Sequence, residues 1–228
     1  MRWPTLALAL SWLCLMLPTP AQAQSAPAAL RLHAGLLRPV LDQWHFEPCD
    51  STPVGPRRAR DVSPESSITS ILTDIGLDRR DTTYIEAFGR VVDGEVRFER
   101  LNRAGAEMTC ASATNADRHW QAQGNEPFWA LRSDARGLSL RQPGSQLNLP
   151  PLALRWNTND GRGGEAAVLV ARTELTALDL TLTARLCRDS MADIAYGFRA
   201  EVVLTRPQAA RFEGCAYLGS ELPPWARP

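Results

Sequence analysis

Apolar and polar residues alternate along much of the second half of this chain. The clearest stretch is residues 178–186, where leucine and alanine occupy every second position and polar residues fill the others. This period of two is typical of a strand with one buried and one solvent-facing side. Six further stretches predict strands, at residues 128–132, 138–141, 152–156, 166–172, 198–204 and 212–218. Short strands with no helix between them predict an antiparallel β-barrel or sandwich.

One segment of the first half has a helical pattern. Its apolar residues follow the spacing i, i+3, i+4 and i+7, at Ile68, Ile71, Leu72 and Ile75. This spacing places all four on one face of a helix. Ser63 suits the N-terminal cap, Pro64 suits the first turn, and Gly76 suits the end. We expect this helix to lie across the mouth of a small barrel.

The rest of the first half predicts strands. Residues 84–92 and 95–101 should form a hairpin, because Asp93 and Gly94 between them favour a type I′ turn. Residues 30–46 should include one more strand. This half loosely resembles the small OB-type barrels of envelope lipoproteins. The expected fold is therefore mainly β, with a small OB-like β-barrel and one α-helix followed by a C-terminal antiparallel β-barrel or sandwich.

The polar, small-residue stretch 111–117 predicts a linker between the two halves. We therefore expect a small β domain with one helix over residues 24–110. An antiparallel β domain should follow over residues 118–219. The last residues, 220–228, contain three prolines and should form a flexible tail.

The first 23 residues have the pattern of a secretory signal peptide. Arg2 provides the positive start, residues 6–17 are almost entirely apolar, and Ala21 and Ala23 frame a small-x-small cleavage site. The apolar run is shorter than the roughly 20 residues that a spanning helix needs. Leu13 before Cys14 argues against lipidation. We expect cleavage after Ala23, a periplasmic or secreted protein, and no integral membrane span after cleavage.

The charge balance argues against polyanionic partners. The chain has 25 basic and 25 acidic residues, and the signal would remove Arg2 alone. No basic block is present to follow a phosphate backbone or an anionic membrane. Nucleic acid is therefore not an expected partner.

Four cysteines remain once the signal is removed, at positions Cys49, Cys110, Cys187 and Cys215. An even number in an exported protein indicates disulfides, and four cysteines allow three pairings. Sequence order and the expected division favour Cys49–Cys110 and Cys187–Cys215. The three histidines are scattered and no Cys/His cluster occurs, so neither a metal site nor a cofactor is expected.

The hexapeptide G-N-E-P-F-W, residues 124–129, carries the first candidate chemistry. Phe128 and Trp129 are adjacent in a strand, so one should enter the core while the other lies outside. Glu126 and an exposed Trp129 could form a ligand platform. In the structural alternative, which the sequence alone favours, the Glu126 carboxylate accepts backbone N–H groups or pairs with an arginine.

A second candidate segment follows Cys187. Asp189 and Asp193 flank a short loop that could join Glu126 at a cation or a substrate proton. In the alternative, these aspartates bond their own backbone. Met191 could fill a core gap or contact a ligand. Ser190 lacks the G-x-S-x-G context of a serine hydrolase, and no catalytic residue is assigned.

These segments together resemble an uncharacterised family of bacterial envelope proteins and lipoproteins. The shared features are G-N-E-P-F-W, then C-x-D-x-M-x-D with Tyr196 shortly after, then G-C-A at residues 214–216. The resemblance covers residues 119–219, and such domains occur alone or near META-type domains and inhibitors of C-type lysozyme. Ala192 and Gly197 depart from the family pattern. The family has no established activity, so the resemblance implies an envelope setting and no mechanism.

The expected function is a periplasmic, non-enzymatic binding or envelope-stress module. Its ligand-binding residues would be Glu126, Trp129, Asp189, Met191, Asp193 and Tyr196. One alternative is an inhibitor of a cell-wall hydrolase such as lysozyme. Another is a carboxylate-based hydrolase that uses Glu126 with Asp189 or Asp193, which would require two carboxylates within about 10 Å across a pocket.

Overall fold

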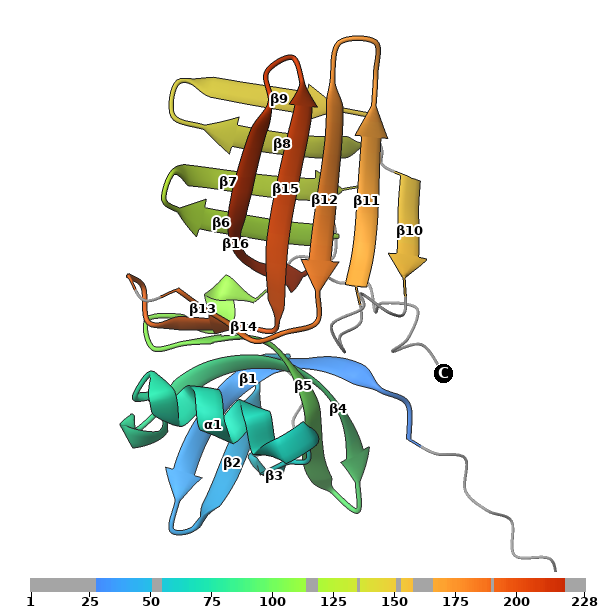
Figure 1. Ribbon diagram of the computed structural model, residues 1–228. Helices are drawn as coiled ribbons and strands as arrows, with labels where there is room; N and C mark the ends of the chain where they lie inside the picture. The colour runs from blue at the N-terminus through green and yellow to red at the C-terminus, as the bar shows by residue number, and fades with distance from the viewer. Residues whose placement is uncertain are drawn as a thin grey trace, which may run out of the picture.

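In the computed structural model, the described part of the chain forms two β-sheets and one α-helix (Figure 1). The structure describes residues 28–50, 55–113, 119–134, 136–150, 153–157, 166–189 and 191–219. The expected signal peptide, residues 114–117 of the expected linker, Ser190 and the C-terminal tail lie outside these ranges. The mainly β fold expected from the sequence is confirmed.

The first sheet contains a closed five-stranded barrel. Its strands are β1 (Arg31–Val40), β2 (Gln43–Pro48), β3 (Arg57–Asp61), β4 (Thr83–Val92) and β5 (Glu95–Gly105). The strand order is β5-β3-β2-β1-β4, and pairing of β4 with β5 closes the barrel. β3 and β5 run parallel, whereas the other neighbours are antiparallel. This confirms the OB-like barrel.

The helical segment between β3 and β4 has the expected buried face. The 3-10 turn η1 (Pro64–Ser66) leads into α1 (Ser67–Asp74), and η2 (Leu77–Arg79) follows. The four residues of the apolar stripe, Ile68, Ile71, Leu72 and Ile75, are all buried in the core of the small barrel. Asp61 caps the helix, because its carboxylate accepts the Thr69 N–H at 2.8 Å and the Ser63 N–H at 2.8 Å. Gly76, with φ of 72°, ends it.

The turns of the small barrel agree with the sequence at one end and differ at the other. Asp93 and Gly94 both have positive φ, 52° and 78°, as a type I′ turn requires. Residues 30–46 were expected to include one strand but contain β1 and most of β2. A two-residue turn separates them, in which Leu41 has φ of 55° and is 97% exposed. The apolar Leu41 concealed this turn from pattern analysis.

The second sheet has nine strands and curls into a nearly closed antiparallel barrel. Its members in spatial order are β10 (Ala153–Asn157), β11 (Ala166–Arg172), β12 (Ala177–Thr183), β15 (Phe198–Arg206), β16 (Ala210–Leu218), β6 (Trp120–Asn125), β7 (Phe128–Asp134), β8 (Gly137–Gln142) and β9 (Ser145–Leu149). Buried side chains of the other eight strands, all but β10, form one hydrophobic core.

Each half of the chain contributes residues to the sheet or the core of the other half. The hairpin of β13 (Cys187–Asp189) and β14 (Ile194–Tyr196) leaves the large barrel and pairs with β5, extending the first sheet. In return, Leu30 and Phe88 from the first half pack into the core of the large barrel. The 3-10 turn η3 (Cys110–Ser112) begins the connection between the halves. The two barrels therefore share both a sheet and a core.

A buried polar cluster holds this junction together. Glu86 is fully buried and accepts hydrogen bonds from Tyr84 Oη at 2.6 Å and Asn102 Nδ2 at 2.9 Å. Arg103 contacts the same carboxylate through Nε at 2.9 Å and Nη2 at 2.8 Å. Burial and the bond to Glu86 raise the pKa of the Tyr84 hydroxyl. The buried charge is thus both paired and hydrogen-bonded, as burial of a carboxylate requires.

Both disulfides expected from sequence order are present, Cys49–Cys110 and Cys187–Cys215. Each joins cysteines of the same half.

In the described part of the chain, no helix has the length and apolar character needed to cross a bilayer.

Candidate functional site

Three sequence segments that are far apart in the chain line one groove of about 730 Å³. They are residues 123–126 at the end of β6 and in the turn that follows, residues 187–189 with Met191 of the β13 hairpin, and residues 213–215 of β16. Strands β12 and β15 complete the lining with Thr181, Thr183, Arg199, Ala200 and Glu201, together with Arg185 after the end of β12 and Arg211 of β16. The sequence motifs therefore converge on one surface of the fold.

The floor of the groove is the outer face of four neighbouring strands, β12, β15, β16 and β6. Cross-strand pairing aligns Thr183, Arg199 and Cys215 in one row, and Thr181, Glu201 and Glu213 in the next. The Cys187–Cys215 disulfide fastens the β13 hairpin to this floor. The hairpin consequently forms a fixed wall of the groove.

Glu126 lies in the turn between β6 and β7, preceding a cis proline, Pro127. Its side chain is exposed and has no hydrogen bond or ion pair with any residue that the structure describes. The described residues therefore provide no partner for the structural alternative favoured by the sequence, a carboxylate tied to the turn. The carboxylate remains available at the rim of the groove.

The two aromatic residues after this turn point to opposite sides, as expected. Trp129 is completely buried, and its Nε1 donates to the Glu213 carbonyl at 3.1 Å. The expectation that Trp129 faces a ligand is thus corrected, because the indole fills the core beneath the groove. Phe128 is the exposed member of the pair, at 47%.

Asp189 has a structural partner on each side. Its Oδ1 accepts the Met191 N–H at 3.0 Å, which shapes the hairpin loop, and Asn125 Nδ2 at 3.0 Å. The second bond links the hairpin to the end of β6, so the two motif segments contact each other directly. Met191 is 79% exposed and lines the groove. Asp193 is exposed at the hairpin tip, with φ of 48°, and does not belong to the groove lining.

Tyr196 is buried and lies behind the site rather than on its surface, which corrects its expected role as a ligand contact. Its hydroxyl accepts a hydrogen bond from Gln123 Nε2 at 3.0 Å, and its ring stacks on Tyr217. Burial, together with the nearby Asp189 charge, raises the pKa of this hydroxyl. Arg103 lies over the other ring, 4.2 Å from the Tyr217 centroid. Tyr196 therefore links the groove to the polar cluster at the junction.

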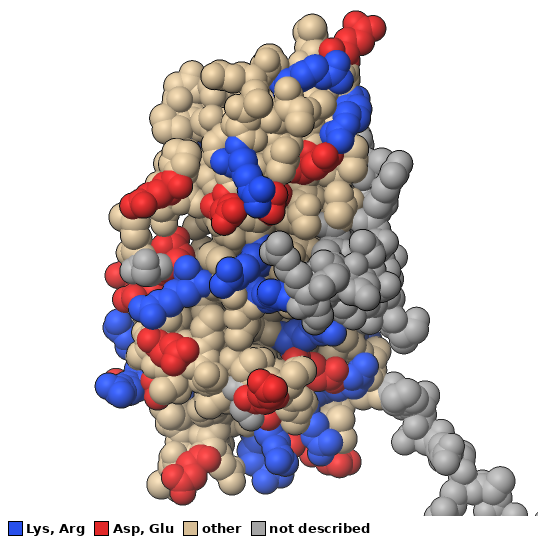
Figure 2. Space-filling view, in the orientation of Figure 1, with Lys and Arg blue, Asp and Glu red and all other residues tan. Residues whose placement is uncertain are grey.

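The arginines of the groove differ in their partners. Arg211 pairs with both Glu201, at 3.1 Å, and Glu213, at 3.4 Å. Arg188 and Arg199 instead donate to backbone carbonyls of Asp74 and Leu186. Figure 2 shows basic side chains gathered in a band where the two barrels meet, with a mixed acidic and basic group above it. The groove thus presents both signs of charge.

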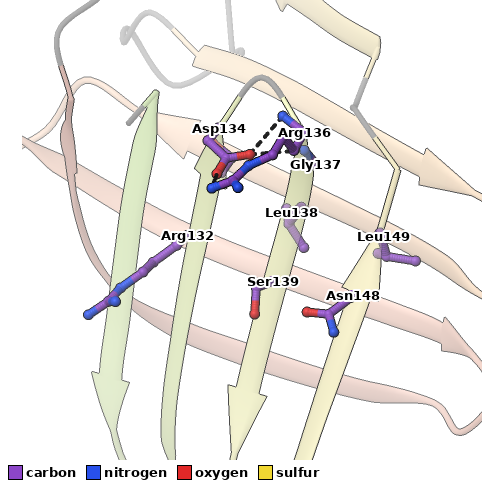
Figure 3. A pocket seen from close by; sticks show the side chains of 9 residues that line it. Arg132, Asp134, Arg136, Gly137, Leu138, Ser139, Asn148 and Leu149 are labelled. Carbon is purple, nitrogen blue, oxygen red and sulfur yellow. Dashed lines mark hydrogen bonds and ion pairs between the residues drawn. The ribbon is translucent and has the colours of Figure 1, made fainter. Parts of the chain in front are cut away.

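Two smaller hollows lie elsewhere. One of about 470 Å³ borders the β7–β8 turn, where the Arg136 N–H lowers the pKa of Asp134 and Asp134 also accepts the Gly137 N–H (Figure 3). The other, also about 470 Å³, lies beside the Cys49–Cys110 disulfide, with His33 in its wall. The sequence motifs contribute to neither of these hollows but do line the groove, so the groove is the candidate site.

The described residues contain no cluster of three or more His, Cys, Asp or Glu side chains suited to a metal ion. Glu126 and Asp189 share the groove, but one is exposed to solvent and the other accepts two hydrogen bonds. Neither carboxylate lies in an apolar enclosure formed by described residues.

Sequence reasoning missed the charged floor. Arg199, Glu201, Arg211 and Glu213 occupy the solvent-facing positions of ordinary alternating strands. Only strand pairing brings them beside the motif segments.

Comparisons of the chain with protein-family models, with curated proteins and with solved structures found no match.

Proposed function

We propose that this chain is an exported, non-enzymatic binding module of the bacterial envelope and that the groove is its ligand site. The observation that carries this proposal is the convergence of residues 124–126, residues 187–189 with Met191, and residues 214–215 on one groove of about 730 Å³. This volume falls in the range of ligand pockets, roughly 300–1,000 Å³. The resemblance of the same segments to an envelope family supports the setting.

Export is supported by two features. The N-terminal pattern is that of a cleaved signal, and both disulfides need an oxidising compartment to persist. Mass spectrometry of the protein recovered from a bacterial periplasm should give a mature N-terminus at Gln24. An intact or lipidated N-terminus would contradict export by this route.

Photo-cross-linking tests the site itself. A photoreactive phenylalanine analogue is placed at Met191 in the groove or at Leu175 in the β11–β12 turn. Both positions are 79% exposed, so the two probes meet solvent equally. In envelope extracts, position 191 should give a discrete adduct that excess unlabelled protein competes away. Equal labelling from both positions would refute the groove as the ligand site.

A second candidate function, inhibition of a cell-wall hydrolase, is favoured by the shape of the β13–β14 hairpin. Its tip extends from the side of the molecule (Figure 1) and carries exposed Met191 and Asp193. The Cys187–Cys215 disulfide braces its base. A braced, protruding, acidic loop could enter an enzyme cleft and bind without refolding.

The inhibitor candidate is tested by lysis of bacterial cell walls with a C-type lysozyme. Added protein should slow the initial lysis rate, and Asp193→Asn should weaken this effect while Leu175→Ala leaves it unchanged. A lysis rate that is independent of added protein would eliminate this candidate for C-type enzymes.

A further inference from the structure

The basic end of the groove has two guanidinium groups, those of Arg188 and Arg199, that have no carboxylate partner among the described residues. Arg188 Nη1 contacts the Asp74 carbonyl at 3.4 Å, and Arg199 Nε contacts the Leu186 carbonyl at 3.5 Å. Both side chains are exposed, and neither forms an ion pair with a described residue. A guanidinium that bonds a single backbone oxygen keeps other N–H donors available for an anion.

The acidic end has the opposite imbalance. Glu201 and Glu213 are directly paired across β15 and β16, an arrangement in which like charges repel. Among the described residues, Arg211 is the guanidinium that pairs with them. Glu126 adds an exposed carboxylate to the same lining. The described carboxylates at this end therefore exceed the cation that balances them, and a ligand cation would relieve the repulsion.

We propose that the groove binds an extended polypeptide segment that carries an acidic side chain toward Arg188 and Arg199 and a basic side chain toward Glu201 and Glu213. This inference rests on the proposed function, because it names the ligand class of the same groove. A uniform polyanion such as nucleic acid would meet repulsion at the acidic end. An apolar ligand would leave these charges desolvated and unpaired.

The spacing of the charges sets the pattern of the ligand. Arg199 and Glu201 are two residues apart on one strand, which corresponds to roughly 7 Å. A segment that lies extended along β15 has the same rise per residue. Its acidic and basic side chains should therefore be separated by one residue, so that both point toward the groove.

A phage-displayed library of random dodecapeptides, selected on the full-length mature protein, tests this inference. Enriched sequences should contain an acidic and a basic residue separated by one position. A synthetic copy of the strongest binder should lose at least about threefold in affinity on the Arg188→Gln/Arg199→Gln protein. Arg136→Gln, in the exposed β7–β8 turn, is the matched control and should leave the affinity unchanged.

Charge reversal provides a test that does not depend on loss of binding. The Arg188→Glu/Arg199→Glu protein should enrich peptides in which a basic residue replaces the acidic one. The urea midpoint of each variant, measured alongside, establishes that it is folded. Enrichment of uncharged or apolar peptides, no enrichment at all, or unchanged selection by the reversed protein would overturn the polypeptide assignment. Cross-linking from position 191 would then still decide separately whether the groove binds an envelope component.

Discussion

The side-chain amide of Asn102 in β5 hydrogen-bonds both backbone polar groups of Leu218 in β16. Its Oδ1 accepts the Leu218 N–H at 2.8 Å, and its Nδ2 donates to the Leu218 carbonyl at 3.1 Å. Asn102 also donates to the buried Glu86 carboxylate. One amide therefore occupies the place of a neighbouring strand and joins the barrels where their backbones do not pair.

Replacing this amide should destabilise the whole protein. Asn102→Ala leaves the N–H and carbonyl of Leu218 buried without these partners, at roughly 1–3 kcal/mol for each group. The free energy of unfolding from urea titration should fall accordingly. Asn148→Ala, at an exposed asparagine of β9, is the control and should stay within about 0.5 kcal/mol of wild type. A similarly small loss for Asn102→Ala would contradict a coupling role.

The docked face of α1 should be sensitive to truncation. Leu72 is 1% exposed, so Leu72→Ala creates a cavity and should cost about 2–5 kcal/mol. Leu175→Ala makes the same chemical change at 79% exposure and should cost less than about 0.5 kcal/mol. Urea midpoints of the two variants make the comparison. Equal losses would show that the helix is not docked in solution.

A Glu→Gln substitution should leave stability unchanged at Glu126 and lower it at Glu86. Glu126→Gln changes an exposed carboxylate without a described partner, so stability should stay within about 0.5 kcal/mol of wild type. Glu86→Gln alters charged hydrogen bonds in a buried site and should cost at least roughly 1.5–3 kcal/mol. A loss of this second size at Glu126 would restore the structural role that the sequence alone favours.

His33 should make stability depend on pH. Its ring is partly buried against Phe46, and Nε2–H donates to the Gly89 carbonyl at 3.2 Å. Burial lowers the pKa of His33 below its ordinary value of 6.5, with Arg57 and Arg31 adding to the effect and the Gly89 bond and Asp50 opposing it. The unfolded chain therefore takes up the proton first as pH falls.

The contribution of neutral His33 should thus be complete above about pH 6.5 and decline as the pH is lowered below that value. Unfolding free energies of wild type and His33→Gln, measured between about pH 5 and pH 8, isolate the effect. Below about pH 6.5, the unfolding free energy of the wild type should fall more steeply than that of His33→Gln. A difference that stays constant over this range would rule out the lowered pKa.

Local signals explain which parts of the fold were predictable. The helix stripe around Ile71 and the turn at Asp93 and Gly94 depend on neighbouring residues alone, and both are confirmed. The alternation of apolar residues likewise revealed most strands of the large barrel. Residues Trp120–Asn125 of β6 and Ser145–Leu149 of β9 were missed, because glutamine, glycine and asparagine interrupt their patterns.

The rest depended on contacts between residues distant in sequence. Phe88 reads as an ordinary inward position of a small barrel, yet it packs into the core of the other barrel. Glu86 reads as a solvent-facing acid but is completely buried. Nothing near residues 194–196 signals their pairing with Arg103–Gly105 on the other half. The charged floor of the groove could not be predicted from the sequence for the same reason, because pairing between distant strands assembles it.

The β13–β14 hairpin has a mechanical consequence. One side is fixed covalently to β16 through Cys187–Cys215, whereas the other side is held to β5 through the pairs Ile194 with Gly105, Ala195 with Ala104, and Tyr196 with Arg103. Under tension between the barrels the covalent disulfide holds, so this short ladder must break together with the hydrogen bonds of Asn102 to Leu218. The β13–β14 hairpin would then remain attached to the large barrel and separate from β5. The wall of the groove would move with it.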